Sequence, residues 1–309
     1  MGDPAPASAD ADIPVAVRDR LRAVRGFVFD MDGTLVLGDR HNRELVPLPG
    51  ALEITRWVTR QGKPFAIFTN GTTRTPRQYA ETLRSIGFDL PDHAMLTPAS
   101  SAVAVFARQR YRRVLVLGDE GLAGPVRDAG IDVVPVAECQ GAGTAGAADA
   151  ADAVDVAAAV DAVLVGWYPS FTMPALEAAC HAVWSGAALY SCSQSMFFAT
   201  AGGRAIGTSR AISAMIKSLT GCRVRVVGKP SLDALRSAGQ RLGIPPADLA
   251  VVGDDPELEV PMAHRGHALA VAVTSGIGTA DSFDRLPRVR WPHLRVGGVD
   301  ELLSILTRP

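Results

Sequence analysis

Short apolar runs alternate with longer segments of helical periodicity along most of the chain. The runs at 24–30 (VRGFVFD) and 63–70 (KPFAIFTN) are typical of buried strands. Between them, the segment 48–63 (LPGALEITRWVTRQGK) places Leu52, Trp57 and Val58 on one side of a helix. A strand, a helix and a second strand in this order predict a β-α-β unit, and therefore a parallel sheet.

The same alternation continues to the C-terminal third of the chain. Further strands are expected at 113–118, 131–136, 161–167, 188–193, 224–229, 249–254 and 267–273. Helical segments precede or follow each of them, for example 75–88, 173–187, 208–221 and 232–243. The pattern predicts an α/β fold throughout.

The segment 141–160 (GAGTAGAADAADAVDVAAAV) interrupts this alternation with a strong bias to Ala and Gly. Its first six residues match G-x-G-x-x-G, with Asp161 about 20 residues further on, as in dinucleotide-binding fingerprints. Such a match arises easily in a biased sequence, and several polar residues separate it from the preceding apolar run. We therefore favour a surface linker that leads into an Ala-rich helix.

Composition narrows the classes of protein to consider. The 309 residues carry a net charge of −1, so no nucleic-acid or anionic-membrane surface is expected. Four scattered cysteines without a C-x-x-C pair favour reduced thiols and a cytoplasmic location. No apolar run has the length of a membrane span, and residues 1–20 are interpreted as a disordered tail without the features of a signal peptide.

Two carboxylates end the first strand. Asp30 and Asp32 follow the apolar run at 24–29, and Gly33 allows the chain to turn sharply after them. In open α/β sheets, ligands bind at the carboxyl ends of the strands, where both acids would lie. An Asp-Gly turn without a function is the alternative.

Polar residues follow two other strands. Thr69, Asn70 and Gly71 offer a hydroxyl, a side-chain amide and an unobstructed backbone N–H, which together suit phosphate oxygens. Lys229 follows the strand at 224–228 in a chain that otherwise uses arginine almost everywhere, which indicates a need for a compact point charge. A polar loop with helix N-caps and a surface lysine are the simpler alternatives.

The strand at 249–253 ends in Asp254 and Asp255, and Glu257 and Glu259 follow closely. Acids without local bases favour a divalent cation, and Mg²⁺ prefers oxygen ligands that include one or two carboxylates. Acids in the first turn of a helix, where they complement its dipole, are the alternative and account well for Glu257.

Taken in order, the motifs DMDGT (30–34), FTNGT (68–72), GKP (228–230) and VVGDD (251–255) resemble the four motifs of the haloacid dehalogenase (HAD) superfamily. The GKPS-type third motif and the long α/β insert resemble the branch of NagD and p-nitrophenyl phosphatase, which has a C2-type cap. The resemblance implies a Rossmann-like parallel-sheet core formed by residues 21–96 and 202–309. It also implies an inserted α/β cap formed by residues 97–201.

The resemblance also implies roles for individual residues. Asp30 would be the nucleophile that forms an aspartyl-phosphate, and Asp32 the general acid and then base. Thr69 and the backbone of Asn70 and Gly71 would hold the phosphoryl group, and Lys229 would offset its charge. A Mg²⁺ ion would be bound by Asp30, the Asp32 carbonyl oxygen and Asp254.

Some positions depart from the branch pattern. The last acidic position of the fourth motif is Glu259, while Asp255 directly follows Asp254, so either acid could hold the metal's waters or Lys229. Trp167 and Tyr168 stand where an acidic residue is usual, and Ser193 and Ser195 stand where Asn and Asp are usual. These four residues are the candidates for choosing the substrate.

The resemblance implies a Mg²⁺-dependent phosphatase of a small phosphorylated metabolite, such as a sugar phosphate, a glycerol or glycolate phosphate, or a nucleoside monophosphate. A phosphotransferase would use the same residues, with an alcohol in place of water. A catalytically silent HAD fold used for binding or regulation is an alternative from another class. A homodimer through the cap is an expectation from the resemblance alone.

Overall fold

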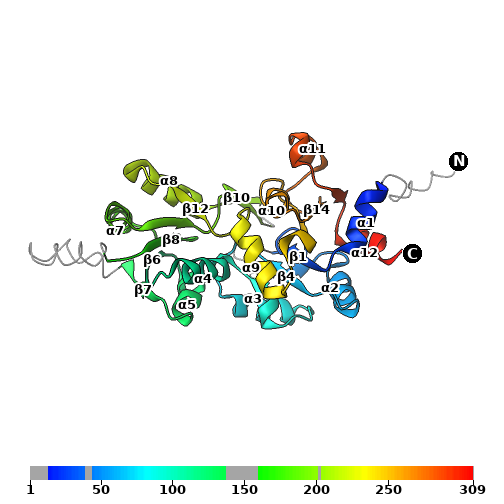
Figure 1. Cartoon of the computed structure of the whole chain (residues 1–309), viewed down its shortest axis with the longest axis horizontal. Helices are drawn as coiled ribbons and strands as arrows, with labels where there is room; N and C mark the ends of the chain where they lie inside the picture. Colours follow the sequence, from blue (N-terminus) through cyan, green and yellow to red (C-terminus); the bar gives the residue numbers. More distant parts are fainter. Residues whose placement is uncertain (1–12, 39–43, 137–158, 201–202, 309) are drawn as a thin grey trace, which may run out of the picture.

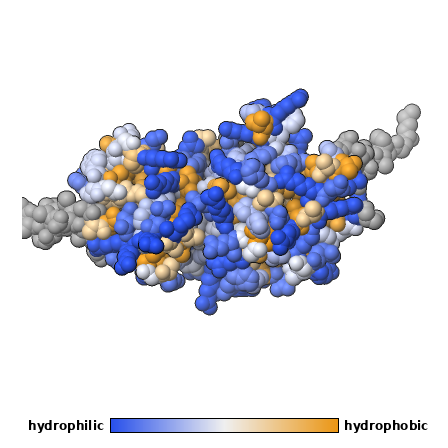
Figure 2. Space-filling model, in the orientation of Figure 1, coloured by the Kyte–Doolittle hydropathy of each residue, from blue (hydrophilic) through white to orange (hydrophobic). Residues whose placement is uncertain are grey.

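The computed structural model describes residues 13–38, 44–136, 159–200 and 203–308. The G-x-G-x-x-G match at 141–146, and the linker and Ala-rich helix expected around it, lie outside these residues. The described elements form two units side by side, each built on its own parallel sheet (Figure 1). The face in Figure 2 is largely hydrophilic, with apolar residues in small groups.

The first sheet has six strands in the order β15-β14-β13-β1-β4-β5, and all its neighbouring strands are parallel. The strands are β1 (Gly26–Asp30), β4 (Phe65–Phe68), β5 (Met95–Leu96), β13 (Leu249–Gly253), β14 (Leu269–Val273) and β15 (Leu294–Val296). Its two halves come from the two ends of the chain, as the β-α-β pattern and the inserted segment predict.

Helices cover both faces of this sheet because side chains alternate along each buried strand. Phe27 and Phe29 of β1 pack in one core cluster, and Val28 packs in the other. The first cluster contains residues from α1 (Val15–Ala23), α2 (Ala51–Arg60), α3 (Pro76–Ser85) and α12 (Val299–Thr307). The second contains residues from α9 (Leu232–Leu242), α10 (Glu259–Arg265) and α11 (Ala280–Asp284).

The second sheet has five parallel strands in the order β12-β9-β8-β6-β7. These are β6 (Arg113–Leu117), β7 (Asp132–Val134), β8 (Ala162–Val165), β9 (Ala188–Ser191) and β12 (Val224–Val226). Residues of α4 (Pro98–Gln109) and α5 (Glu120–Asp128) pack on one face, and residues of α7 (Met173–Trp184) and α8 (Thr208–Thr220) on the other. The α/β class is therefore confirmed in both units.

Short elements complete the described chain. Two hairpins pair β2 (Val36–Leu37) with β3 (Val46–Pro47), and β10 (Phe197–Thr200) with β11 (Gly203–Ile206). Single 3₁₀ turns lie at Asp92–Ala94, Pro246–Asp248 and Arg288–Arg290. In the part of the chain that the structure describes, no helix combines the length and the apolar character needed to cross a membrane.

The boundaries of the two units differ from the expected ones. Strand β12 pairs with β9, with Val224 opposite Leu189, and Ile212 and Ile216 of α8 share a core cluster with α7. Residues 208–226 were expected in the core, but they supply an edge strand and a covering helix to the second sheet. We call the residues 98–226 the cap and the other described residues the core. At the N-terminus, α1 begins at Val15, inside the segment expected to be a disordered tail.

A half-buried histidine, His293, links several segments of the outer part of the core. His293 Nδ1 accepts a hydrogen bond from the Ala270 N–H at 2.9 Å, and its Nε2 lies 2.9 Å from the Arg20 guanidinium. The His264 ring centroid lies 5.0 Å from that of His293. Burial first, and then the nearby Arg20 and His264, lower the pKa of His293 to about 4.

We expect this histidine to make stability fall in mild acid. Its folded pKa lies below the unfolded value of about 6.5, so its contribution is complete above pH 6.5 and is lost as the pH falls towards 4. Because the ring is half-buried, we expect a loss of only about 1 kcal/mol between pH 7.5 and 5. Urea unfolding should show this loss in the wild type and in an exposed control, His181→Asn, but not in His293→Asn. An equal pH dependence in all three proteins would contradict the assignment.

Candidate active site

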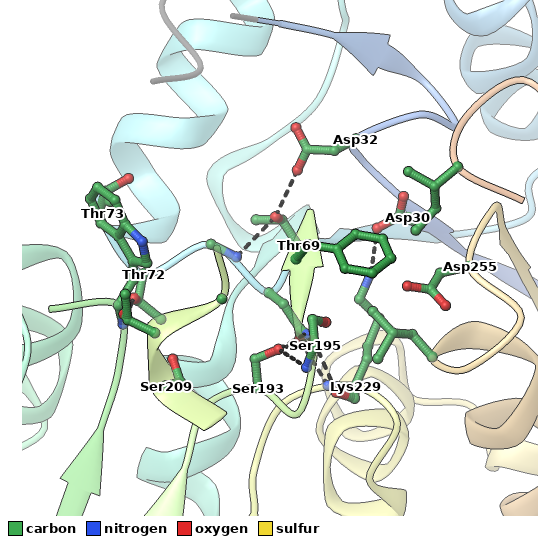
Figure 3. Close-up of a pocket in the computed structure, with 18 of the residues that line it drawn as sticks. Asp30, Asp32, Thr69, Thr72, Thr73, Ser193, Ser195, Ser209, Lys229 and Asp255 are labelled. Atoms are coloured by element: carbon green, nitrogen blue, oxygen red, sulfur yellow. Dashed lines mark hydrogen bonds and ion pairs between the residues drawn. The ribbon is translucent and has the colours of Figure 1, made fainter. Parts of the chain in front are cut away.

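A cavity of about 380 Å³ opens where the carboxyl ends of strands from both sheets meet (Figure 3). The core contributes mainly charged and polar residues, namely Asp30, Asp32, Thr69–Arg74, Lys229, Asp254, Asp255 and Glu259. The cap contributes Asp119, Trp167, Ser193, Ser195, Phe197, Thr208 and Ser209. Every core residue that the sequence offered as catalytic, phosphate-binding or metal-binding therefore lines one cavity.

Asp30 is the last residue of β1 and is only 6% exposed. Its Oδ1 forms an ion pair with Lys229 Nζ, and its Oδ2 accepts a hydrogen bond from Thr34 Oγ1 at 3.1 Å (Figure 3 shows the ion pair). Both oxygens are thus held by donors that fix the direction of the carboxyl group. A buried carboxylate that lines a cavity is suited to nucleophilic attack.

Lys229 is 2% exposed and contacts a second acid, since its Nζ lies 2.7 Å from Glu259 Oε1. Burial by itself would lower the pKa of Lys229, but the Asp30 and Glu259 carboxylates outweigh burial and raise it. Burial raises the pKa of Glu259 to about 8, against the opposing effect of Lys229. The lysine therefore stays charged, which agrees with the point charge expected at this position.

The geometry separates the roles of the two alternative acids. Glu259 reaches Lys229 with one oxygen, and its Oε2 accepts the Asp255 N–H at 3.0 Å. Asp255 turns its Oδ1 to the Glu257 N–H at 2.7 Å. Glu259, at the start of α10, is therefore the acid that contacts the lysine, and Asp255 lines the cavity beside it.

Asp254 follows β13 and is 4% exposed. Its Oδ2 accepts the Ile277 N–H at 2.7 Å and lies against the backbone of two glycines. A Cβ would come within 2.5 Å of this oxygen at Gly33 and within 1.9 Å at Gly276, so both positions require glycine. Burial, and then the nearby Asp30 and Glu259, raise the pKa of Asp254 well above its usual range.

The charges of this cluster fit a divalent cation. Asp30, Asp254 and Glu259 are buried together, and Lys229 contacts two of them, Asp30 and Glu259. Within the described ranges, no group of three or more His, Cys, Asp or Glu side chains is arranged to hold a metal by itself. An ion would therefore take the carboxylates of Asp30 and Asp254 together with backbone oxygen and water, which is the kind of shell that Mg²⁺ prefers.

Asp32 lies on the opposite side of the cavity from Lys229 (Figure 3). Its Oδ2 accepts a hydrogen bond from Thr69 Oγ1 at 3.1 Å, and this hydroxyl in turn accepts the Gly71 N–H at 3.0 Å. The half-buried carboxylate is thus oriented by the loop that follows β4. A carboxyl group in this position can give a proton to a leaving group and take one from water.

The Asn70 side chain differs from the expectation that it is offered to phosphate. Its Nδ2 donates to the Lys229 carbonyl at 3.0 Å and to Ser193 Oγ at 3.3 Å, and its Oδ1 accepts the Lys229 N–H at 2.8 Å. The amide is therefore occupied in joining three segments of the chain. The Gly71 N–H, also expected to meet phosphate, is occupied by Thr69 Oγ1.

On the cap side, three neighbouring strands end in a row. Leu117 of β6 is opposite Val165 of β8, which is opposite Ser191 of β9. Asp119, Trp167 and Ser193 each follow two residues later, and all three line the cavity. Trp167 and Ser193 were expected to choose the substrate, and Ser195 joins them through a 3.1 Å contact between its Oγ and that of Ser193.

Two cap residues depart from the expectation. Tyr168 is not among the lining residues, because its ring packs edge-on against Phe171 inside the cap. Asp119 was missed, although the segment VLVLGDE has the same form as the core motifs, an apolar run that ends in an acid. This shared form is the signal by which the sequence could have identified Asp119.

Comparisons with known proteins find related sequences over most of the chain. A model of haloacid dehalogenase-like hydrolases matches residues 27–132, and a HAD-hydrolase-like model matches residues 226–302. The ribonucleotide monophosphatase NagD of Escherichia coli K12 is 23% identical over 278 residues, covering 90% of this chain and 98% of that protein. Human chronophin is 28% identical over 270 residues, covering 85% of each chain.

Solved structures show the same fold. A p-nitrophenyl phosphatase from Archaeoglobus fulgidus superposes with a TM-score of 0.74 at 24% identity, covering 91% of this chain and 98% of that one. A glycerol phosphate phosphatase from Mycobacterium tuberculosis, in complex with calcium, gives a TM-score of 0.72 at 24% identity over 92% and 76% of the two chains. The chain belongs to the haloacid dehalogenase-like hydrolases, in the branch of phosphatases that includes NagD.

Proposed function

We propose that the protein is a Mg²⁺-dependent phosphatase that hydrolyses phosphate monoesters of small metabolites through an aspartyl-phosphate. The observation that carries this proposal is the buried Asp30–Lys229 pair, which faces Asp32 across one cavity. Relatives bear the names of phosphatases of ribonucleotides, p-nitrophenyl phosphate and glycerol phosphate, which supports a small phosphorylated substrate.

In the first step, a carboxylate oxygen of Asp30 forms a bond to phosphorus while the bond to the leaving oxygen breaks. Asp32 gives its proton to that oxygen, so the alcohol leaves neutral. In the second step, water attacks the phosphorus of the aspartyl-phosphate, Asp32 takes a proton from it, and Asp30 is released with inorganic phosphate. Thr69 orients Asp32 for both transfers.

The transferring phosphoryl group needs positive charge around it rather than further covalent chemistry. Lys229 supplies one fixed charge. Thr69 and the backbone of Asn70 and Gly71 would complete the proposed phosphate site, with phosphate replacing Thr69 Oγ1 as the acceptor of the Gly71 N–H. The Asp30 and Asp254 carboxylates and the Asp32 carbonyl oxygen would hold the Mg²⁺ ion. When bound, the ion neutralises phosphate oxygens and the crowded carboxylates.

The size of the cavity supports a small substrate. About 380 Å³ is at the lower end of the range for small-molecule sites, and cap residues cover it. Sugar phosphates, glycerol or glycolate phosphates and nucleoside monophosphates are of this size. Phosphotransfer to an alcohol would use the same residues as hydrolysis. The homodimer and the cytoplasmic location stay predictions.

We expect the protein to hydrolyse p-nitrophenyl phosphate with Mg²⁺ and to lose about tenfold or more of this rate in excess EDTA. Added Mg²⁺ should restore the rate, which separates loss of the ion from unfolding. Release of inorganic phosphate in equal amount to p-nitrophenol, without a phosphorylated product when glycerol is added, would favour hydrolysis over phosphotransfer. If the protein binds Mg²⁺ but hydrolyses no phosphate ester, it would instead be a catalytically silent HAD fold.

A further inference from the structure

We infer that Asp119 determines substrate specificity by selecting leaving groups that carry a vicinal diol and by disfavouring those with a second negative charge. The inference rests on the proposed function and deepens it, since it names the chemistry of the alcohol that leaves. It depends on a cap residue that takes no part in the two proton transfers or in phosphate binding.

The position of Asp119 follows from the register of the cap sheet. It stands two residues beyond the end of β6, next to Trp167 on the neighbouring strand end. The carboxyl edge of a parallel sheet is where ligands of α/β folds bind, and here it lines the cavity that also holds Asp30. Asp119 is thus placed to meet the part of the substrate that lies beyond its phosphate.

The carboxylate of Asp119 is available for a ligand. It stands at the N-cap of α5 but makes no capping hydrogen bond, and it has no hydrogen-bond or ion-pair partner among the residues that the structure describes. The residue is exposed, in contrast to Asp30 and Asp254, whose carboxylates are buried and bonded. Its acceptor capacity is therefore not used by the fold.

An ionised carboxylate only accepts hydrogen bonds, and its two oxygens can accept from two adjacent hydroxyls at once. Trp167, beside it, offers an apolar ring to the C–H face of a polyol or sugar. Thr73, Thr208 and Ser209 also line the cavity, and their hydroxyls can donate to or accept from further hydroxyls. This set suits an uncharged, hydroxyl-rich leaving group.

The same charge works against acidic leaving groups. A carboxylate or a second phosphate near Asp119 would meet like charge in a partly enclosed cavity. Among the described residues, two cations line the cavity. Lys229 contacts Asp30 and Glu259, and Arg74, whose backbone packs against Gly121 of α5, has its guanidinium 5.8 Å from the Tyr79 ring centroid. Asp119 therefore separates neutral polyol phosphates from phosphorylated acids.

The test compares kcat/KM for pairs of substrates that differ only in the diol. The pairs are ribose 5-phosphate with 2-deoxyribose 5-phosphate, glycerol 3-phosphate with propyl phosphate, and adenosine 5′-monophosphate with its 2′,3′-dideoxy analogue. The wild type should prefer the diol in at least one pair by about 10- to 100-fold, as expected for hydrogen bonds to a charged group. The pair that shows this preference identifies the source of the diol.

In Asp119→Asn and Asp119→Ser this preference should fall to within a few-fold of unity. Both variants should also raise kcat/KM for 2-phosphoglycolate by about tenfold, because the like charge is gone. Ser is a second choice that suits an N-cap, so one of the two should fold even if the other does not. Asp128→Asn, at the exposed end of the same helix, is the charge-matched control and should keep the wild-type preference.

The failures can be told apart. If p-nitrophenyl phosphate is hydrolysed but the wild type shows no diol preference, or the Asp119 variants keep it and gain nothing on 2-phosphoglycolate, the inference is overturned and the proposed function stands. If the wild type hydrolyses no phosphate ester at all, the proposed function fails and the inference fails with it.

Discussion

An Asp30→Asn protein is expected to lose its turnover of p-nitrophenyl phosphate by about a thousandfold or more. An amide is a far weaker nucleophile than a carboxylate, and it cannot form the aspartyl-phosphate. The substitution keeps the shape of the side chain, and Lys229 keeps its contact with Glu259. The thermal unfolding temperature, measured beside the rate, separates loss of the nucleophile from loss of the fold.

The measurement is the initial rate with Mg²⁺, together with trapping of a phosphorylated protein by acid quench. Labelled phosphate should be retained by the quenched wild type and absent from Asp30→Asn. Asp248→Asn, an exposed acid that pairs with Arg25 on the surface, is the control for loss of one carboxylate. A rate in Asp30→Asn within tenfold of the wild type would remove Asp30 from the nucleophile's role.

The second large effect is expected from Lys229→Met. The variant leaves Asp30 and Glu259 buried without the ammonium that contacts both of them. Loss of one partner from a buried ion pair typically costs about 3–5 kcal/mol, because the remaining charge is left uncompensated. Loss of a preorganised charge at the phosphoryl group should lower kcat by about 100- to 1,000-fold.

Urea unfolding and steady-state rates would separate these two effects. Lys217→Met, on the exposed side of α8, is the matched control and should change neither the free energy of unfolding nor kcat appreciably. A double variant, Lys229→Met with Glu259→Gln, should recover part of the stability but none of the rate. Recovery of the rate by the double variant would mean that Lys229 acts only by balancing charge in the fold.

Much of the core site could be predicted because its residues obey one local rule. Asp30 ends a buried parallel strand, Thr69 and Asp254 follow two others, and the carboxyl ends of parallel strands meet at one edge of the sheet. Asp119 obeys the same rule in the cap. It escaped attention because the sequence does not show that the carboxyl edge of a second sheet faces the first.

The boundary between the two units and the roles of the individual acids could not be predicted from the sequence. The periodicity of β12 and α8 marks them as a strand and a helix, but the same pattern would suit either sheet. Glu259 and Asp255 differ by four positions, and only the start of α10 shows that Glu259 turns back to Lys229. For Asn70, the sequence offers an amide but does not reveal its three hydrogen bonds to Lys229 and Ser193.

The place of Lys229 in the chain has a mechanical consequence. The lysine lies on the crossing from β12 of the cap to α9 of the core, and Asn70 holds the backbone of this crossing from both sides of the residue. Because Asn70 belongs to the core, it anchors the lysine to the core at the point where the chain leaves the cap. The ammonium and the carboxylate of Asp30 are therefore held by the same unit.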